Sequence, residues 1–202
     1  MGCLRKIVQI IILALAIVGF VTIGGKDFLI AQYNKYLGTA KTSVMERASK
    51  LGDFSELSDE FDIDKAASAF GYKGVLAEHE ASGQKMLIVD TGKKPMLTEE
   101  DFDENKAEAK IKDLIKSFSY KSLQIDDFTI IKTGKLNAYG ENIKYIGFTA
   151  KINKLPIGKV RGMISAIDLS SDKSFVLLSL NEDKKYSQLI ADEFFKKVKP
   201  AK

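Results

Sequence analysis

Residues 143–152 read Ile-Lys-Tyr-Ile-Gly-Phe-Thr-Ala-Lys-Ile, and this stretch decides the fold because its side chains alternate with the two-residue period of a β-strand. One face carries Ile146, Phe148, Ala150 and Ile152. The other face carries Tyr145, Gly147, Thr149 and Lys151. An apolar face backed by a more polar one predicts a strand in a sheet that has one side on a hydrophobic core.

Three further apolar runs surround this strand, at residues 123–133, 157–167 and 175–180. Turn-forming segments separate the runs, among them Asn-Ala-Tyr-Gly at 137–140 and Asn-Lys-Leu-Pro at 153–156. Such short links join antiparallel neighbours, because parallel strands need long crossover connections. The sequence therefore predicts a four-strand antiparallel meander, whose last run is apolar on both faces and forms a central strand.

Elements on either side of the meander complete the expected domain. Residues 75–80 and 84–90 form two strand-like runs around a Gly-bearing turn, which predicts a hairpin. Residues 98–120 begin with a Thr cap and continue with apolar residues at helical spacing. A last helix is expected from Tyr186 to Val198, where apolar residues step by four. Helices that cover a mainly antiparallel sheet give an α+β globular domain over residues 55–202.

This order of elements resembles the PsbP and DcrB type of α/β/α sandwich over roughly residues 74–198. The nearest matching features are Phe-Thr-Ala-Lys-Ile at 148–152, followed by a second strand, and Leu-Leu-Ser-Leu at 177–180 before the last helix. The resemblance implies a small membrane-associated or exported protein that binds or stabilises partners. It implies no functional residue, because no functional motif of these proteins is found in the chain.

The first residues of the chain suggest a membrane anchor. Residues 7–25 carry no charge, and a helix of this length spans roughly 28 Å, close to the ~30 Å hydrocarbon thickness of a bilayer. A short basic tail, residues 1–6, precedes this predicted transmembrane helix, and its charges favour a cytoplasmic amino terminus with the carboxyl-terminal domain exported. The residues expected to face lipid are Ile7, Ile11, Leu15, Val18 and Val21. The alternative is a cleaved signal peptide, which would make the protein secreted.

Residues 26–54 are expected to form a juxtamembrane helical stalk. Ile30, Leu37, Val44 and Leu51 recur at seven-residue spacing in this segment. A short seam of this kind predicts weak self-association of the stalk. The alternative is an amphipathic helix that lies on its own domain or on the lipid headgroups.

The composition argues against most catalytic and metal chemistry. One Cys, one His and no Trp cannot supply a zinc site, and His79 stands between two Glu residues with no nucleophile motif elsewhere. Glu60, Asp62 and Asp64 alternate as in a calcium loop, but the Gly and the final Glu of such a loop are missing. The net charge of +4 is too small to indicate a nucleic-acid partner. The sequence therefore predicts no catalytic residue, no metal and no cofactor.

One cluster of side chains is a candidate contact site. Three basic residues surround Leu-Pro-Ile at 155–157, namely Lys154, Lys159 and Arg161. We expect them to contact lipid headgroups or an acidic partner. The alternative is that they are the water-exposed side chains of a strand face. The predicted function is a noncatalytic domain, anchored in the lipid bilayer by a single span, that binds a partner protein or another envelope component. Two alternatives remain at this point. One is an envelope enzyme or small-ligand carrier that uses a pocket and carboxylates of the sheet, and the other is a structural anchor assembled through its stalk.

Overall fold

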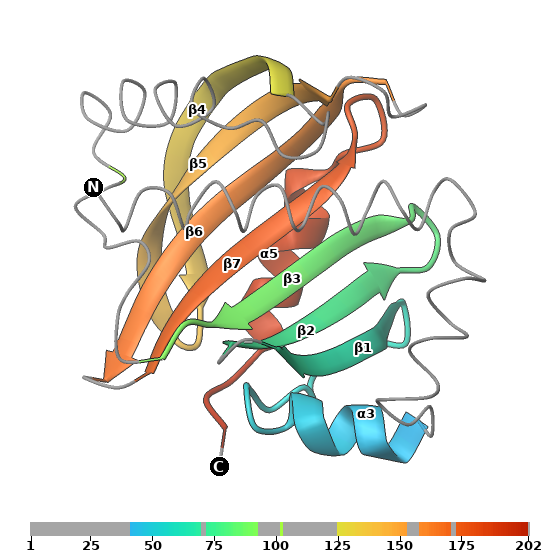
Figure 1. Cartoon of the computed structure of the whole chain (residues 1–202), viewed down its shortest axis with the longest axis vertical. Helices are drawn as coiled ribbons and strands as arrows, with labels where there is room; N and C mark the ends of the chain where they lie inside the picture. The colour runs from blue at the N-terminus through green and yellow to red at the C-terminus, as the bar shows by residue number, and fades with distance from the viewer. Residues whose placement is uncertain are drawn as a thin grey trace.

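The computed structural model describes residues 41–69, 72–92, 102, 125–152, 158–170 and 173–201. Its helices and strands are α3 (Lys41–Ala48), β1 (Phe61–Ala69), β2 (Tyr72–His79), β3 (Gln84–Asp90), β4 (Ile125–Ala138), β5 (Glu141–Ile152), β6 (Val160–Ser170), β7 (Lys173–Glu182) and α5 (Gln188–Lys197) (Figure 1). Most of the described residues therefore belong to strands.

The strands form one seven-stranded sheet in the order β1-β2-β3-β7-β6-β5-β4. Every neighbouring pair is antiparallel. Two meanders, β1 to β3 and β4 to β7, meet where β3 pairs with β7 and Ile88 lies opposite Leu177. Because this central pairing joins segments far apart in the sequence, it makes one sheet out of two locally folded units.

Helix α5 lies against one face of the sheet, behind β7 and β3 in the view of Figure 1. Its residues Phe194 and Phe195 are fully buried, and their rings lie edge to face with centroids 5.2 Å apart. The Phe194 ring also lies 5.4 Å from the Phe61 ring of β1. Aromatic packing of this kind ties the last helix to the first strand and forms the centre of the main core.

Helix α3 packs against β1, which is an edge strand of the sheet. Val44 and Leu51 are buried in the same hydrophobic core as α5. Arg47 donates a hydrogen bond from Nη1 to the backbone carbonyl of Ala66, at 3.3 Å. This bond satisfies an acceptor on the edge strand, where backbone groups otherwise lack a strand partner.

The later part of the predicted stalk, residues 41–54, is thus packed onto the domain. Of the side chains expected to mediate self-association, Val44 and Leu51 serve the domain's own core. Ile30 and Leu37 lie outside the described residues. Self-association itself stays a prediction.

Apolar side chains are buried on both faces of the sheet. Ile146, Phe148 and Leu178 are buried on the face opposite α5, while Tyr145 and Leu177 are buried on the α5 face. The expectation that residues 143–152 have only one face on a core is therefore wrong. A sheet covered on both faces has few positions for exposed polar residues, which agrees with the unbroken burial of β7 from Ser174 to Asn181.

The fold class predicted from the sequence, an α+β domain behind a transmembrane helix and a helical stalk, is wrong for the described residues. They form mainly an antiparallel sheet of seven strands with two short helices. Neither of these helices is long and apolar enough to cross a membrane. Residues 7–25, for which the span was predicted, and the helix expected at 98–120 lie outside the described residues, apart from the buried Phe102.

Much of the strand pattern is confirmed. The hairpin expected around Gly83 is β2 and β3, and the four-strand meander is β4 to β7. Strand β1 was not expected, because Asp62, Asp64 and Lys65 give its sequence the appearance of a solvated segment. The resemblance to PsbP and DcrB proteins stays a prediction.

Candidate binding surface

Four polar residues form a continuous row across four neighbouring strands. Thr129 on β4 lies opposite Thr149 on β5, which lies opposite Arg161 on β6, which in turn lies opposite Asn181 on β7. Thr149 shares its face of β5 with Tyr145, so this polar row lies on the same side of the sheet as α5. The polar row therefore replaces the apolar core at one end of that face.

Arg161 is held in place through one of its nitrogens. Its Nε donates to Oδ1 of Asp183 at 2.6 Å, and its side chain remains 41% exposed. No other hydrogen bond of this guanidinium is found among the described residues. Because a guanidinium has five N–H donors, Arg161 keeps unused donors at a fixed position.

Thr149 is the unusual member of the polar row. The residue is only 3% exposed, and its Oγ1 has no hydrogen-bond partner in the part of the chain that the structure describes. A buried hydroxyl without a partner costs about 1–3 kcal/mol of stability. Most buried polar groups in proteins are paired, so this exception calls for a physical reason.

A buried hydrogen-bond network fixes the end of β7 next to the polar row. Gln84, which is fully buried, donates from Nε2 to Oγ of Ser179 and to the carbonyl of Ser187, both at 2.9 Å. Asn181 donates from Nδ2 to the carbonyl of Ser82 at 3.1 Å and to that of Lys185 at 3.3 Å. These bonds hold the loop between β7 and α5, which carries Asp183, against the hairpin of β2 and β3.

Tyr186 extends this network toward the polar row. Burial, with smaller contributions from Tyr145 and Asp192, raises the pKa of the Tyr186 hydroxyl well above its ordinary value, while Ser179 and Arg161 oppose the shift. The hydroxyl therefore stays protonated, and it donates to Oε1 of Gln188 at 3.1 Å. Tyr186 is therefore a neutral phenol near Arg161 and not a charged group.

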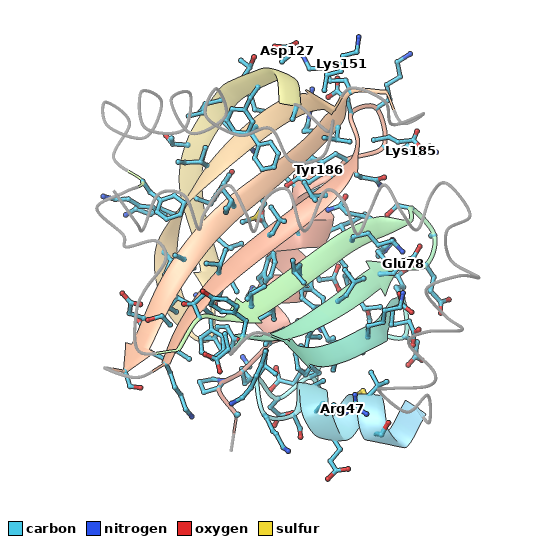
Figure 2. All side chains as sticks on the ribbon, in the orientation of Figure 1. Arg47, Glu78, Asp127, Lys151, Lys185 and Tyr186 are labelled. Carbon is cyan, nitrogen blue, oxygen red and sulfur yellow. The ribbon has the colours of Figure 1, made fainter. Side chains whose placement is uncertain are left out.

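Exposed cations surround the polar row. Lys151 lies opposite Asp127 across β5 and β4, and Figure 2 shows both at one end of the sheet, far from Arg47. Nζ of Lys159 lies 4.0 Å from Oδ2 of Asp127. Lys132 belongs to the same face of β4, with its Nζ 5.4 Å from the centroid of the Tyr145 ring. Among the described residues of this surface, the cations Lys132, Lys151, Lys159 and Arg161 outnumber the carboxylates Asp127 and Asp183.

Two of the three predicted contact residues, Lys159 and Arg161, lie on this surface. Lys154 and the predicted lipid-facing residues lie outside the described residues. The sequence analysis did not select Thr149, Asn181 or Tyr186. Thr149 stands out in the sequence only as a polar residue within an apolar run, and Asn181 only as a polar residue directly after one. The meaning of both depends on the register between strands. Tyr186 was expected only as an apolar position of the last helix.

The contacts of His79 hold the hairpin turn and pack the ring against the core. Its Nδ1 accepts from the Ser82 backbone N–H at 3.3 Å and lies 3.0 Å from Oγ of Ser82, while its ring packs edge-on against Phe61. The described residues contain no group of three or more His, Cys, Asp or Glu side chains that could hold a metal ion.

Comparisons with known proteins do not assign the surface a role. The chain matches no protein-family model, and no curated protein sequence matches it significantly.

Proposed function

We propose that this chain is a noncatalytic binding domain that contacts a partner protein or another envelope component through the polar row and its surrounding cations. The observation that carries the proposal is Arg161, which Asp183 holds in place at the centre of an exposed cluster of lysines. Among the described residues, Asp183 is the only hydrogen-bond partner of this guanidinium, and the side chain is 41% exposed. Arg is enriched at protein–protein interfaces, where its remaining donors can bind a partner.

The charge around the polar row supports the same proposal. An excess of exposed cations at one end of the sheet raises the rate of encounter with an acidic partner and orients it. The buried network of Gln84 and Asn181 holds the neighbouring loop in position. A surface that is rigid before binding loses less conformational entropy when the partner docks.

A charge reversal tests this function in the full chain. We expect chemical crosslinking in the cells that naturally make the protein to yield a discrete partner adduct. The double variant Lys151→Glu with Lys159→Glu is expected to lose that adduct, because both side chains lie in the positive surface. The matched control is Lys173→Glu, an exposed position eight residues before Asn181 along β7, about 26 Å away.

The outcomes separate the proposal from its alternatives. Loss of the adduct in the double variant and its retention in the control, with equal melting temperatures, support binding through this surface. An adduct that both variants retain contradicts it. Crosslinks only between copies of the chain would favour a structural anchor. A saturable thermal shift with a small molecule, in the absence of any protein adduct, would favour a ligand carrier.

Localisation is a separate proposal that rests on the sequence of residues 1–25 alone. We expect a carboxyl-terminal tag on the full chain to stay with carbonate-washed membranes and to be digested by protease added from outside. Release by carbonate would contradict membrane attachment, and a protected tag would place the domain in the cytosol.

A further inference from the structure

We infer that His79 makes the turn between β2 and β3 sensitive to pH, because protonation of the ring exchanges a contact within this turn for a contact with Glu60. The inference goes beyond the proposed function and does not depend on a partner. His79 is the only histidine of the chain. Histidine is the side chain whose ordinary pKa places its change of charge between about pH 5 and about pH 8.

The ring faces the turn through its Nδ1 atom. The Ser82 backbone N–H donates to Nδ1 at 3.3 Å. A ring nitrogen accepts such a bond only through its lone pair, so Nδ1 carries no proton in this arrangement. The Ser82 hydroxyl lies 3.0 Å from Nδ1 and accepts from the Gln84 backbone N–H at 3.2 Å, which leaves its own proton for Nδ1. Both polar groups of Ser82 therefore use the neutral ring as an acceptor.

The Nε2 atom of the ring faces the segment before β1. Because Nδ1 carries no proton, the proton of the neutral ring is on Nε2. Nε2 lies 3.7 Å from Oε2 of Glu60, whose side chain is 65% exposed. This distance is too long for a hydrogen bond, but it allows an ion pair once the ring is charged.

Glu60 is the group that can balance a charge on the ring. No carboxylate of β3, the turn or α5 lies within 4.0 Å of a ring nitrogen among the described residues. Glu78 points to the opposite face of β2, where it pairs with Lys85, and Glu80 is exposed. The residues opposite His79 on the neighbouring strands are uncharged, namely Phe61 and Gln84.

Protonation reverses the role of Nδ1. A charged ring carries a proton on both nitrogens, so Nδ1 becomes a donor. The Ser82 hydroxyl can turn and accept from it, but the Ser82 backbone N–H cannot and loses its partner. The turn therefore rearranges at Ser82, while Nε2 gains an ion pair with Glu60. The Ser82 carbonyl also accepts from Nδ2 of Asn181 at 3.1 Å, so the rearrangement alters the contact that joins the turn to β7.

NMR of the full chain with ¹⁵N-labelled histidine tests the first step, because one histidine gives a single pair of ring nitrogens. We expect a proton on Nε2 alone at about pH 7.5 and on both nitrogens at about pH 5.5. Hydrogen exchange of the Ser82 amide tests the second step. Measured against the intrinsic exchange rate at each pH, its protection should fall about fivefold in acid, the effect of one lost hydrogen bond. His79→Gln should show no such change with pH.

Glu60→Gln tests the contact that the charged ring gains. The variant should melt at the same temperature as the natural chain at about pH 7.5, and about 1–3 °C lower at about pH 5.5, where the ion pair is missing. The matched control is Glu80→Gln, which removes an exposed carboxylate close to the same turn. Its difference from the natural chain should be the same at both pH values.

Three results would each overturn the inference. The first is a proton on Nδ1 at neutral pH. The second is a Ser82 amide whose protection is the same at both pH values. The third is an identical pH dependence of melting in Glu60→Gln and Glu80→Gln. The first two are measured in the natural chain, so they decide the inference even where a variant does not fold.

Discussion

Gln84 and Ser187 exchange two hydrogen bonds although they are 103 residues apart in the sequence. The Gln84 side chain donates from Nε2 to the Ser187 carbonyl at 2.9 Å and accepts at Oε1 from the Ser187 backbone N–H at 2.8 Å. The side-chain amide thus serves the backbone just before α5 as a neighbouring strand would. This pairing fixes where the last helix begins, and with it the loop that carries Asp183.

Replacement of Gln84 should therefore be costly. Gln84→Ala leaves both Ser187 groups and the Ser179 hydroxyl without their partner, and we expect a loss of about 2–4 kcal/mol in the free energy of unfolding, measured by urea denaturation. The control is Asn142→Ala, which removes an exposed amide that accepts a hydrogen bond from Asn137 and should cost less than about 1 kcal/mol. Equal effects of the two variants would show that the buried pairing has no special role.

Leu51 tests whether the segment before β1 belongs to the domain. The side chain is 2% exposed within the main core, so Leu51→Ala should lower the free energy of unfolding by about 2–5 kcal/mol. Met45→Ala is the control, because Met45 is 40% exposed and its truncation should change stability by less than about 0.5 kcal/mol. A Leu51→Ala variant as stable as the natural chain would contradict the packing of this segment.

Gly162 allows the closest packing on the face opposite α5. A Cβ atom at this position would lie about 2.5 Å from both Cδ2 of Leu180 and the carbonyl oxygen of Ser179. Gly162→Ala should therefore cost about 1–3 kcal/mol or prevent folding, because a backbone oxygen cannot move away easily. Gly158→Ala, where a Cβ would meet nothing within 4 Å, should leave the melting temperature unchanged.

The buried tyrosines predict a loss of stability at high pH. Burial raises the pKa of Tyr139 and Tyr186 well above the ordinary value of about 10. The unfolded chain then releases these protons at lower pH than the folded chain, so the stabilisation is complete below about pH 10 and is lost as the pH rises above it. Above that pH, each tyrosine lowers the free energy of unfolding by about 1.4 kcal/mol per pH unit.

Urea denaturation between about pH 9 and about pH 11 measures this slope. Tyr186→Phe should reduce it by the contribution of one tyrosine. Tyr139→Phe should do the same from a lower starting stability, because it also loses the hydrogen bond from the hydroxyl to the Leu51 carbonyl at 2.9 Å. The same pH dependence in the natural chain and in both variants would refute the explanation.

Local patterns in the sequence were enough to predict the hairpin of β2 and β3 and the meander of β4 to β7, because each depends on alternation within a strand and on turn residues between strands. They could not predict the pairing of β3 with β7, which depends on contacts between distant segments. Strand β1 was missed because its charged residues stand beside α3 at the sheet edge, where partial exposure tolerates them. The helices expected at residues 26–54 and 98–120 gave the predicted fold class its helical part, whereas the described residues contain only the two short helices α3 and α5.

The candidate surface was predictable only in part. Lys159 and Arg161 were predicted because the sequence alone shows that they are basic residues close to a turn. The roles of Thr149 and Asn181 arise from the register that places them in one row with Arg161, and no local pattern determines that register. That the Thr149 hydroxyl has no hydrogen-bond partner among the described residues is a result of packing, which the sequence does not reveal.

The most direct test of the binding surface is photocrosslinking from the polar row itself. A benzophenone amino acid is placed at Thr129, which is exposed and opposite Thr149, or at Lys173 at the far end of the same face, in the cells that naturally make the protein. We predict a discrete protein adduct from position 129 that is absent from position 173 and is lost when Arg161→Ala is added. Adducts of equal yield from the two positions, or an adduct at position 129 that survives Arg161→Ala, would contradict the account.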